Sequence, residues 1–156
     1  MIYIECNPDL ALVKSLINVP RRGIVHEYKG KEEICKRLRK QDDSIGLIDE
    51  DPLSTQPSYV KEAGLEGDHS EHDLKLLYHR ASNNYLVVLC PRLEEWVLKA
   101  ARETGIDVRK YDLPNDAARL HRYINIKLGK FENLLEDLRD SSSRLKTLKR
   151  LLERPQ

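Results

Sequence analysis

The sequence predicts an α/β protein built on a mostly parallel sheet that is flanked by helices. Short apolar runs typical of buried strands alternate with segments whose apolar residues recur at helical spacing. The first five of these segments are Ile2 to Ile4, Asp9 to Ile17, Ile24 to Tyr28, Gly30 to Lys40 and Ile45 to Ile48. Strands and helices that alternate in this way favour parallel pairing through right-handed crossovers, which brings the carboxyl ends of the strands to one edge of the sheet.

Turn-forming residues separate these segments and support the same order. Asn7 is a candidate N-cap, and Pro8 suits the first position of the helix that follows. Pro20 and Gly23 interrupt the chain before the second predicted strand, and Pro52 ends the third. Each predicted element therefore has a local reason to begin or end where its apolar pattern does.

The middle of the chain predicts a polar excursion, a strand pair and another helix. Residues 53–73 are polar and are expected to pass over the edge of the sheet. Leu74 to His79 and Tyr85 to Cys90 are predicted strands joined by the turn-forming residues 81–84. The second strand is the more apolar of the two and should be central. A helix is expected from Leu93 to Arg102.

The C-terminal part predicts a helical extension, residues 113–156, on an α/β domain of residues 1–112. A helix is expected over 114–128, and apolar positions recur at helical spacing through 130–153. Four of them fall at seven-residue intervals: Phe131, Leu138, Leu145 and Leu152. This apolar stripe docks either on its own domain or on a second copy, which would give a homodimer. The serines at 141–143 either cap a new helix or leave a polar gap.

Composition bounds the class of protein. The chain has 156 residues, with 27 basic and 26 acidic side chains and a formal net charge of +1, so any attraction to nucleic acid must come from a local patch. Three widely spaced cysteines form neither a metal pair nor a disulfide framework. The N-terminus has no signal-peptide pattern, and no apolar run approaches the length of a membrane span. We expect a soluble, cytoplasmic protein with no membrane contact.

An acidic motif follows the third predicted strand. Alternation along extended chain turns Asp49 and Asp51 to one side and Glu50 to the other. Two carboxylates held close together repel each other, and a divalent cation such as Mg²⁺ or Mn²⁺ relieves that repulsion. The alternative is a solvated acidic turn. Glu5 follows the first predicted strand and should therefore lie at the same edge of the sheet, which favours the metal site.

Other charged groups have simpler interpretations. The segment Asp68 to Asp73 contains two histidines, but on a loop it is expected to be a solvated turn rather than a transition-metal site. Glu94 and Glu95 open a predicted helix, where acidic groups complement the helix dipole. The last predicted helix carries five basic residues, which either contact phosphates or form a solvated face: Arg144, Lys146, Lys149, Arg150 and Arg154.

Taken together, these acidic positions resemble the Toprim domain of topoisomerases, bacterial primases, small ribonucleases and the overcoming-lysogenization-defect nucleases. That pattern has a Glu at the end of the first strand and an acidic residue four positions on, here Glu5 and Asp9. It also has an Asp-x-Asp after the third strand, here Asp49 to Asp51. The pair Gly30-Lys31 and the run Glu94-Glu95-Trp96 are similar to the nuclease branch.

The resemblance implies a Toprim-like, Rossmann-like domain with Mg²⁺-dependent nuclease activity. It implies that Glu5, Asp49 and Asp51 hold one or two Mg²⁺ or Mn²⁺ ions, with Asp9 and Glu94 completing a second site, and that Glu5 also acts as general base. For Glu95 we keep the simpler role at the helix start. The candidate nucleic-acid contacts are Lys31, Arg92, Lys146, Lys149 and Arg150.

The resemblance covers about residues 1 to 105 and departs from the family pattern at one position. Cys6 stands where a glycine usually follows the first Glu, and a side chain there limits how closely a phosphate approaches the backbone. No tyrosine is arranged for topoisomerase chemistry, so hydrolysis is the preferred reaction.

Three alternatives follow from the same residues. A non-catalytic Toprim-like module would bind metal and nucleic acid, or work with a separate partner protein, without turnover. A receiver or a haloacid-dehalogenase-type phosphatase needs acidic residues after its first strand in patterns that Glu5-Cys6 does not provide. A structural protein would pair through residues 130–153 and bind no metal. The sequence leaves open whether the nucleic acid is DNA or RNA.

Overall fold

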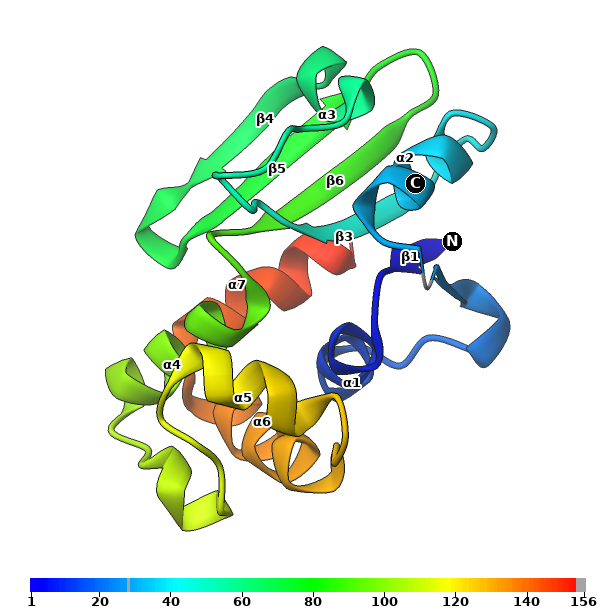
Figure 1. The fold of residues 1–156 in the computed structure, drawn as a ribbon. Coiled ribbons are helices and arrows are strands. Elements are labelled where there is room, and N and C mark those ends of the chain that lie inside the picture. Colours follow the sequence, from blue (N-terminus) through cyan, green and yellow to red (C-terminus); the bar gives the residue numbers. More distant parts are fainter. Residues whose placement is uncertain (28, 154–156) are drawn as a thin grey trace.

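A six-stranded sheet forms the centre of the computed structural model, which describes residues 1–27 and 29–153 (Figure 1). Its parallel strands are β1 (Ile2–Ile4), β2 (Ile24–His26), β3 (Ile45–Asp49) and β6 (Asn84–Leu89). Two antiparallel strands, β5 (Leu74–His79) and β4 (Gly64–His69), extend the sheet beyond β6. The order is β2-β1-β3-β6-β5-β4. The predicted α/β class, with a mostly parallel sheet flanked by helices, is therefore confirmed.

The largest differences from the sequence-based prediction lie in two stretches of the chain. The second strand was expected to reach Tyr28, but β2 ends at His26, and residue 28 lies outside the described residues. The stretch expected as a polar excursion contains a short helix, α3 (Ser58–Glu62), and the strand β4. Its side chains are mostly exposed, because β4 is an edge strand held by backbone pairing with β5. No apolar alternation marks such a strand in the sequence.

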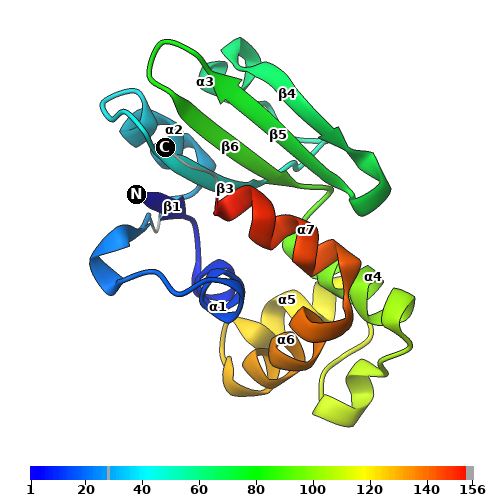
Figure 2. The same cartoon turned by 180° about the vertical axis from the view of Figure 1, so that it is seen from behind.

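Helices cover the sheet unevenly. One face carries α2 (Lys31–Leu38) and α3, and the remaining helices gather on the other side, where Figure 2 shows the end of α7 next to β3. These helices are α1 (Asn7–Leu16), α4 (Leu93–Thr104), α5 (Ala117–Ile124), α6 (Gly129–Ser141) and α7 (Ser143–Leu152). Within the described ranges, no helix combines the length and the apolar character needed to span a bilayer.

Alternation along the strands divides the core into two layers. Ile2 and Ile4 belong to the larger cluster, on the side of α1 and α4 to α7, whereas Tyr3 belongs to the smaller cluster under α2. Gly46 faces α2, and a Cβ at this position would meet Leu38 of α2 at 3.0 Å as well as Leu86 of β6 at 2.8 Å. The close packing of β3 against α2 therefore depends on a residue without a side chain.

The C-terminal apolar stripe docks on its own chain, which is one of the two settings that the sequence left open. Its heptad positions are buried in the larger cluster: Phe131, Leu138, Leu145 and Leu152. That cluster also contains residues from before position 112, such as Leu98. Ser142 separates α6 from α7, and its Oγ accepts a hydrogen bond from the amide of Leu145 at 3.3 Å. The serine run therefore caps a new helix. Dimerisation through this segment stays a prediction that would use its exposed faces.

The basic face expected on the last helix is wrong at one position. Arg144 is fully buried and binds the carboxylates of Glu103 and Asp73 and the carbonyl oxygen of His72. The segment expected as a solvated turn at residues 68–73 is therefore tied to α7 at its end. Tertiary packing of α7 against α4 and this turn, and not the charge pattern of α7, decides where Arg144 lies. Arg154 lies outside the described residues.

Candidate functional site

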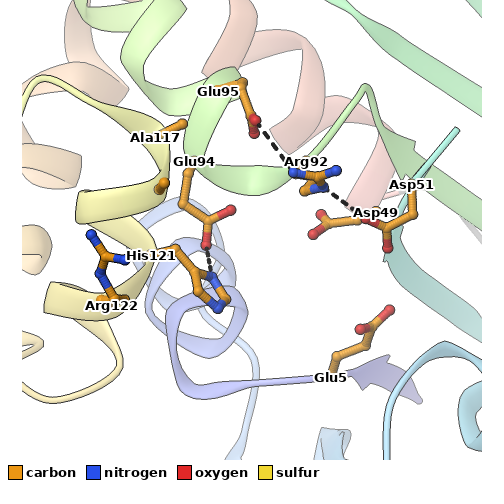
Figure 3. Close-up of a pocket in the computed structure, with 10 residues that line it drawn as sticks. Glu5, Asp49, Asp51, Arg92, Glu94, Glu95, Ala117, His121 and Arg122 are labelled. Atoms are coloured by element: carbon orange, nitrogen blue, oxygen red, sulfur yellow. Dashed lines mark hydrogen bonds and ion pairs between the residues drawn. The ribbon is translucent and has the colours of Figure 1, made fainter. Parts of the chain in front are cut away.

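Carboxylates from three separate parts of the chain meet at the edge of the sheet where the parallel strands end. β1 lies beside β3, so Glu5, just after β1, comes close to Asp49, the last residue of β3. Figure 3 shows the Glu5 carboxylate directed toward Asp49 and Asp51. They line a cavity of about 560 Å³ together with Arg92, Glu94, Glu95, Ala117, Ala118, His121 and Arg122. The predicted convergence of Glu5 with the Asp-x-Asp motif is present.

The acidic motif is held by a turn and by the start of α4. Asp49 Oδ1 accepts a hydrogen bond from the amide of Leu93 at 3.1 Å, at the N-terminus of α4. Asp51 has a positive φ of 46°, so the chain turns after β3 instead of continuing as extended backbone. Its amide donates to the carbonyl oxygen of Pro91 at 3.0 Å. Glu50 faces away, as expected, and pairs with Lys75 at 2.6 Å. The motif has the predicted facing, but a turn produces it.

Lys31 binds the backbone of the acidic motif and does not line the carboxylate cavity. Its Nζ donates to the carbonyl oxygens of Asp49 at 2.9 Å and Glu50 at 3.0 Å, and to Gln56 Oε1 at 3.1 Å. An ammonium group has three hydrogens, so all of them are used. Gln56, which the sequence reasoning missed, also donates to the carbonyl oxygens of Glu50 and Asp51. In this structure Lys31 is a positioning residue and has no free hydrogen for the nucleic-acid contact predicted for it.

Asp9 also has a different place from the predicted one. Its Oδ2 accepts hydrogen bonds from the amides of Glu5 at 3.2 Å and Cys6 at 3.3 Å, and the residue is buried beside the carboxylates without lining the cavity. Cys6 is the N-cap of α1, and it completes a capping box with Asp9. The acidic residue four positions after Glu5 thus caps a helix, and Cys6 provides the N-cap position of that helix.

Crowding of like charges dominates the electrostatics of the site. Burial, reinforced by Asp9, raises the pKa of Glu5 to about 7, although Lys31 acts in the opposite direction. Burial and the surrounding carboxylates raise the pKa of Asp49 to about 9. Burial likewise raises the pKa of Asp9 to about 6. Glu5 Oε1 is buried and has no hydrogen-bond partner. The protein therefore holds acidic groups in a place where ionising all of them is costly.

Only part of this negative charge is balanced. Arg92 Nε lies 2.9 Å from Asp51 Oδ1, and Arg92 Nη1 lies 3.6 Å from Glu95 Oε1 (Figure 3). Glu94 is buried and forms a 2.7 Å contact with His121 Nδ1. These contacts leave Glu5 and Asp49 without an ion pair among the described residues.

His121 and Arg122, on α5, are site residues that the sequence reasoning missed. Leu120 and Ile124 mark the buried side of α5 at helical spacing, so a polar boundary beside them was visible in the sequence. No pattern in the sequence connected that boundary to the strand ends, because the packing of α5 against the distant helix α4 brings it to the cavity.

The donor chemistry of the site suits a hard divalent cation, but the side chains are not yet gathered around one. Within residues 1–27 and 29–153, no three acidic, His or Cys side chains are close enough together to hold a metal ion as they stand. Asp51 is engaged by Arg92 and Glu94 by His121, whereas Glu5 has an unpartnered oxygen. Carboxylate oxygens are the ligands that Mg²⁺ and Mn²⁺ prefer. Glu5, Asp49 and Asp51 therefore supply suitable donor atoms, and Asp51 would have to leave Arg92 to act as a ligand. A second site built from Asp9 and Glu94 is not assembled.

The predicted basic contacts on α7 lie away from the carboxylates. Lys146 and Lys149 line a separate cavity with Ser15 and Arg139. Arg150 donates to Thr147 on its own helix. Of the predicted nucleic-acid contacts, only Arg92 lines the carboxylate cavity.

Comparison of the chain with protein-family models, with curated proteins and with solved structures gave no match.

Proposed function

We propose that this protein hydrolyses phosphodiester bonds of nucleic acid with the help of Mg²⁺ or Mn²⁺ at the carboxylate cavity. The observation that supports this most is the convergence of Glu5, Asp49 and Asp51 at one edge of the sheet, with the pKa values of Glu5 and Asp49 raised to about 7 and about 9. Protein folding gains nothing from such crowding, whereas a doubly charged cation is stabilised by it.

The order of the acidic residues supports a Toprim-like, nuclease-branch assignment. Glu5 follows the first strand and Asp49 and Asp51 follow the third strand of a mostly parallel sheet, in the order of the Toprim pattern. The three cysteines are free thiols, which agrees with the expected cytoplasmic setting.

The residues of this chain have separable roles in the proposed reaction. Asp49 and Asp51 would hold the cation, which stabilises the attacking water and the leaving oxygen when bound. Glu5 would accept a proton from that water, since it has an unpartnered buried oxygen and a pKa raised to about 7. Lys31 and Gln56 would keep the acidic turn in place through its carbonyl oxygens.

The test is cleavage of labelled single- and double-stranded DNA and RNA with Mg²⁺ or Mn²⁺, and it compares the wild type with Asp49→Asn and Glu50→Gln. We expect Asp49→Asn to lose at least about a hundredfold in rate, because it removes a charged ligand of the cation and loss of even an outer-shell group costs ten- to a hundredfold. Glu50→Gln is the matched control, because Glu50 is adjacent in sequence but pairs with Lys75 away from the cavity. Cleavage that persists in Asp49→Asn would refute the assignment.

The second candidate function is a binding module without turnover, alone or with a separate partner protein. It is favoured by the engagement of Asp51 with Arg92 and of Glu94 with His121, and by the lack of an assembled metal site in the described part of the chain. Metal-dependent binding of DNA or RNA by the wild type, with no cleavage of either, would support the module and exclude hydrolysis.

A further inference from the structure

The carboxylate cavity has two walls of different chemistry. The strand wall carries Glu5, Asp49 and Asp51. The helical wall comes from the start of α4 and from α5, and it carries the two guanidinium groups of the cavity, Arg92 and Arg122. Figure 3 shows this division, with α5 on the opposite side of the cavity from Asp51. An extended anion lying across the cavity would meet both walls.

Arg122 has no protein partner among the described residues. The residue is exposed on α5, and no hydrogen bond or ion pair joins its guanidinium to the part of the chain that the structure describes. Ala117 and Ala118, one turn earlier on the helix, also line the cavity and keep it open because their side chains are small. A guanidinium offers donors in a planar fork that matches two phosphate oxygens.

Arg92, in contrast, is held by acidic groups of the same cavity. Its contact with Asp51 involves the carboxylate that the proposed function assigns to a divalent cation. Arg92 and that cation therefore compete for one side chain. Its second contact, with Glu95, is longer at 3.6 Å and lies on the helical wall, so Arg92 keeps an anchor there when Asp51 is taken.

The charge of the cavity makes phosphate binding dependent on a cation. Five carboxylates line it against two guanidinium groups, a formal excess of three negative charges when all are ionised. A phosphodiester, itself negative, is repelled from such a cavity until part of this charge is neutralised.

Resting on the proposed function, we propose that Arg92 and Arg122 bind the phosphate backbone of a nucleic-acid strand, and that Arg92 reaches this backbone only after a divalent cation has replaced it at Asp51. The cation then does two things, because it removes repulsion and frees a phosphate ligand. By linkage, the strand strengthens cation binding by the same factor as the cation strengthens strand binding.

The cation half is tested by calorimetry with Mn²⁺ alone, without nucleic acid. Arg92→Gln should bind Mn²⁺ about fivefold more tightly than the wild type, since it removes a competing ion pair of ordinary surface strength. Lys75→Gln is the control, because it also removes a cation paired with a carboxylate, but Glu50 does not line the cavity. Unchanged or weaker Mn²⁺ binding by Arg92→Gln, or an equal gain in Lys75→Gln, would overturn the proposal.

The phosphate half is tested by fluorescence anisotropy with a labelled single-stranded oligonucleotide, in Ca²⁺ and in EDTA. In Ca²⁺, Arg122→Gln should bind about tenfold more weakly than the wild type, the effect of one charge-assisted hydrogen-bonded pair. Arg92→Gln should lose most of the Ca²⁺-dependent gain. Arg119→Gln, an exposed arginine of α5 outside the cavity, should change affinity by less than about twofold.

The outcomes separate this inference from the proposed function. Equal weakening in Arg119→Gln and Arg122→Gln would mean that any positive charge on α5 has the same effect. That result would overturn the proposed phosphate subsite, which is made of Arg92 and Arg122. Binding of inorganic phosphate, but not of the oligonucleotide, with the same arginine dependence would overturn a strand as the ligand. Absence of cleavage by the wild type contradicts the hydrolase but leaves these binding results standing. Loss of cleavage in Asp49→Asn with unchanged binding in both cavity-arginine variants supports the hydrolase and rejects the subsite.

Discussion

Two groups of charged side chains are wholly or partly buried in this protein, one around Arg144 and one around Asp49. They differ in whether opposite charges balance them. Around Arg144, opposite charges meet: its guanidinium binds Glu103 through two hydrogen bonds of 2.9 and 3.1 Å and Asp73 through one of 2.9 Å. Around Asp49, like charges meet, and the ammonium group of Lys31 donates mainly to carbonyl oxygens instead of pairing with a carboxylate.

The pKa values move in opposite directions as a result. The hydrogen bonds from Arg144 lower the pKa of Glu103. Burial alone would raise the pKa of Asp73, but Lys99 and Arg144 outweigh burial and lower it. In the cavity nothing outweighs burial, and the pKa values of Glu5 and Asp49 rise. The opposite charges around Arg144 hold helices together. The like charges around Asp49 repel one another, and a bound cation can relieve that repulsion.

The largest effect expected from this contrast is on folding stability at Arg144. Arg144→Met should lower the free energy of unfolding by about 3 kcal/mol. This is the lower end of the range for breaking a buried ion pair, because Glu103 and Asp73 are partly exposed and water can hydrate them in the variant. Urea denaturation measures it. Lys149→Met, on the exposed side of the same helix, should cost less than about 0.5 kcal/mol. Equal stability of the two variants would mean that the Arg144 cluster does not hold α7 in place.

At Asp49 the expected change has the opposite sign. A carboxyl whose pKa is raised on folding binds more protons in the folded state, so its contribution to stability falls as pH rises from about 4, the unfolded value, to about 9. An asparagine at this position cannot ionise, so Asp49→Asn removes this loss of stability at high pH. Its amide oxygen can still accept the hydrogen bond from the amide of Leu93. We expect the variant to be more stable than the wild type at pH 8 and to approach it at pH 4. Thermal unfolding as a function of pH measures both values, and parallel curves would contradict the raised pKa.

The smallest effect is expected at Lys31, the cation built into the acidic group. Lys31→Met should cost about 1 kcal/mol, because three oxygen atoms lose a donor while nearby water replaces part of the loss. The pKa of Glu5 should rise further, since Lys31 lowers it. Denaturation and a carboxyl titration by NMR check the two effects. Lys36→Met, exposed on the same helix, is the control and should change neither.

Sequence reasoning reached the convergence of Glu5 with Asp49 and Asp51 because it needed only local patterns and one topological rule. Apolar runs located the strands, and parallel crossovers placed their carboxyl ends together. Sequence reasoning failed where a side chain could bind either the protein itself or a ligand. Asp9 caps the helix that follows it, and Lys31 bonds to carbonyl oxygens, although both residue types also suit a metal or phosphate site.

The amino-acid sequence by itself determined the alternation of strands and helices, the apolar stripe of the last two helices and the edge at which the acidic residues gather. Tertiary structure alone decided that Arg144 is buried, that β4 completes the sheet and that α5 brings His121 and Arg122 to the cavity. The physical reason is range. Periodicity and turn chemistry act between neighbours in the chain, whereas the partner of a charge is set by whichever distant element packs against it.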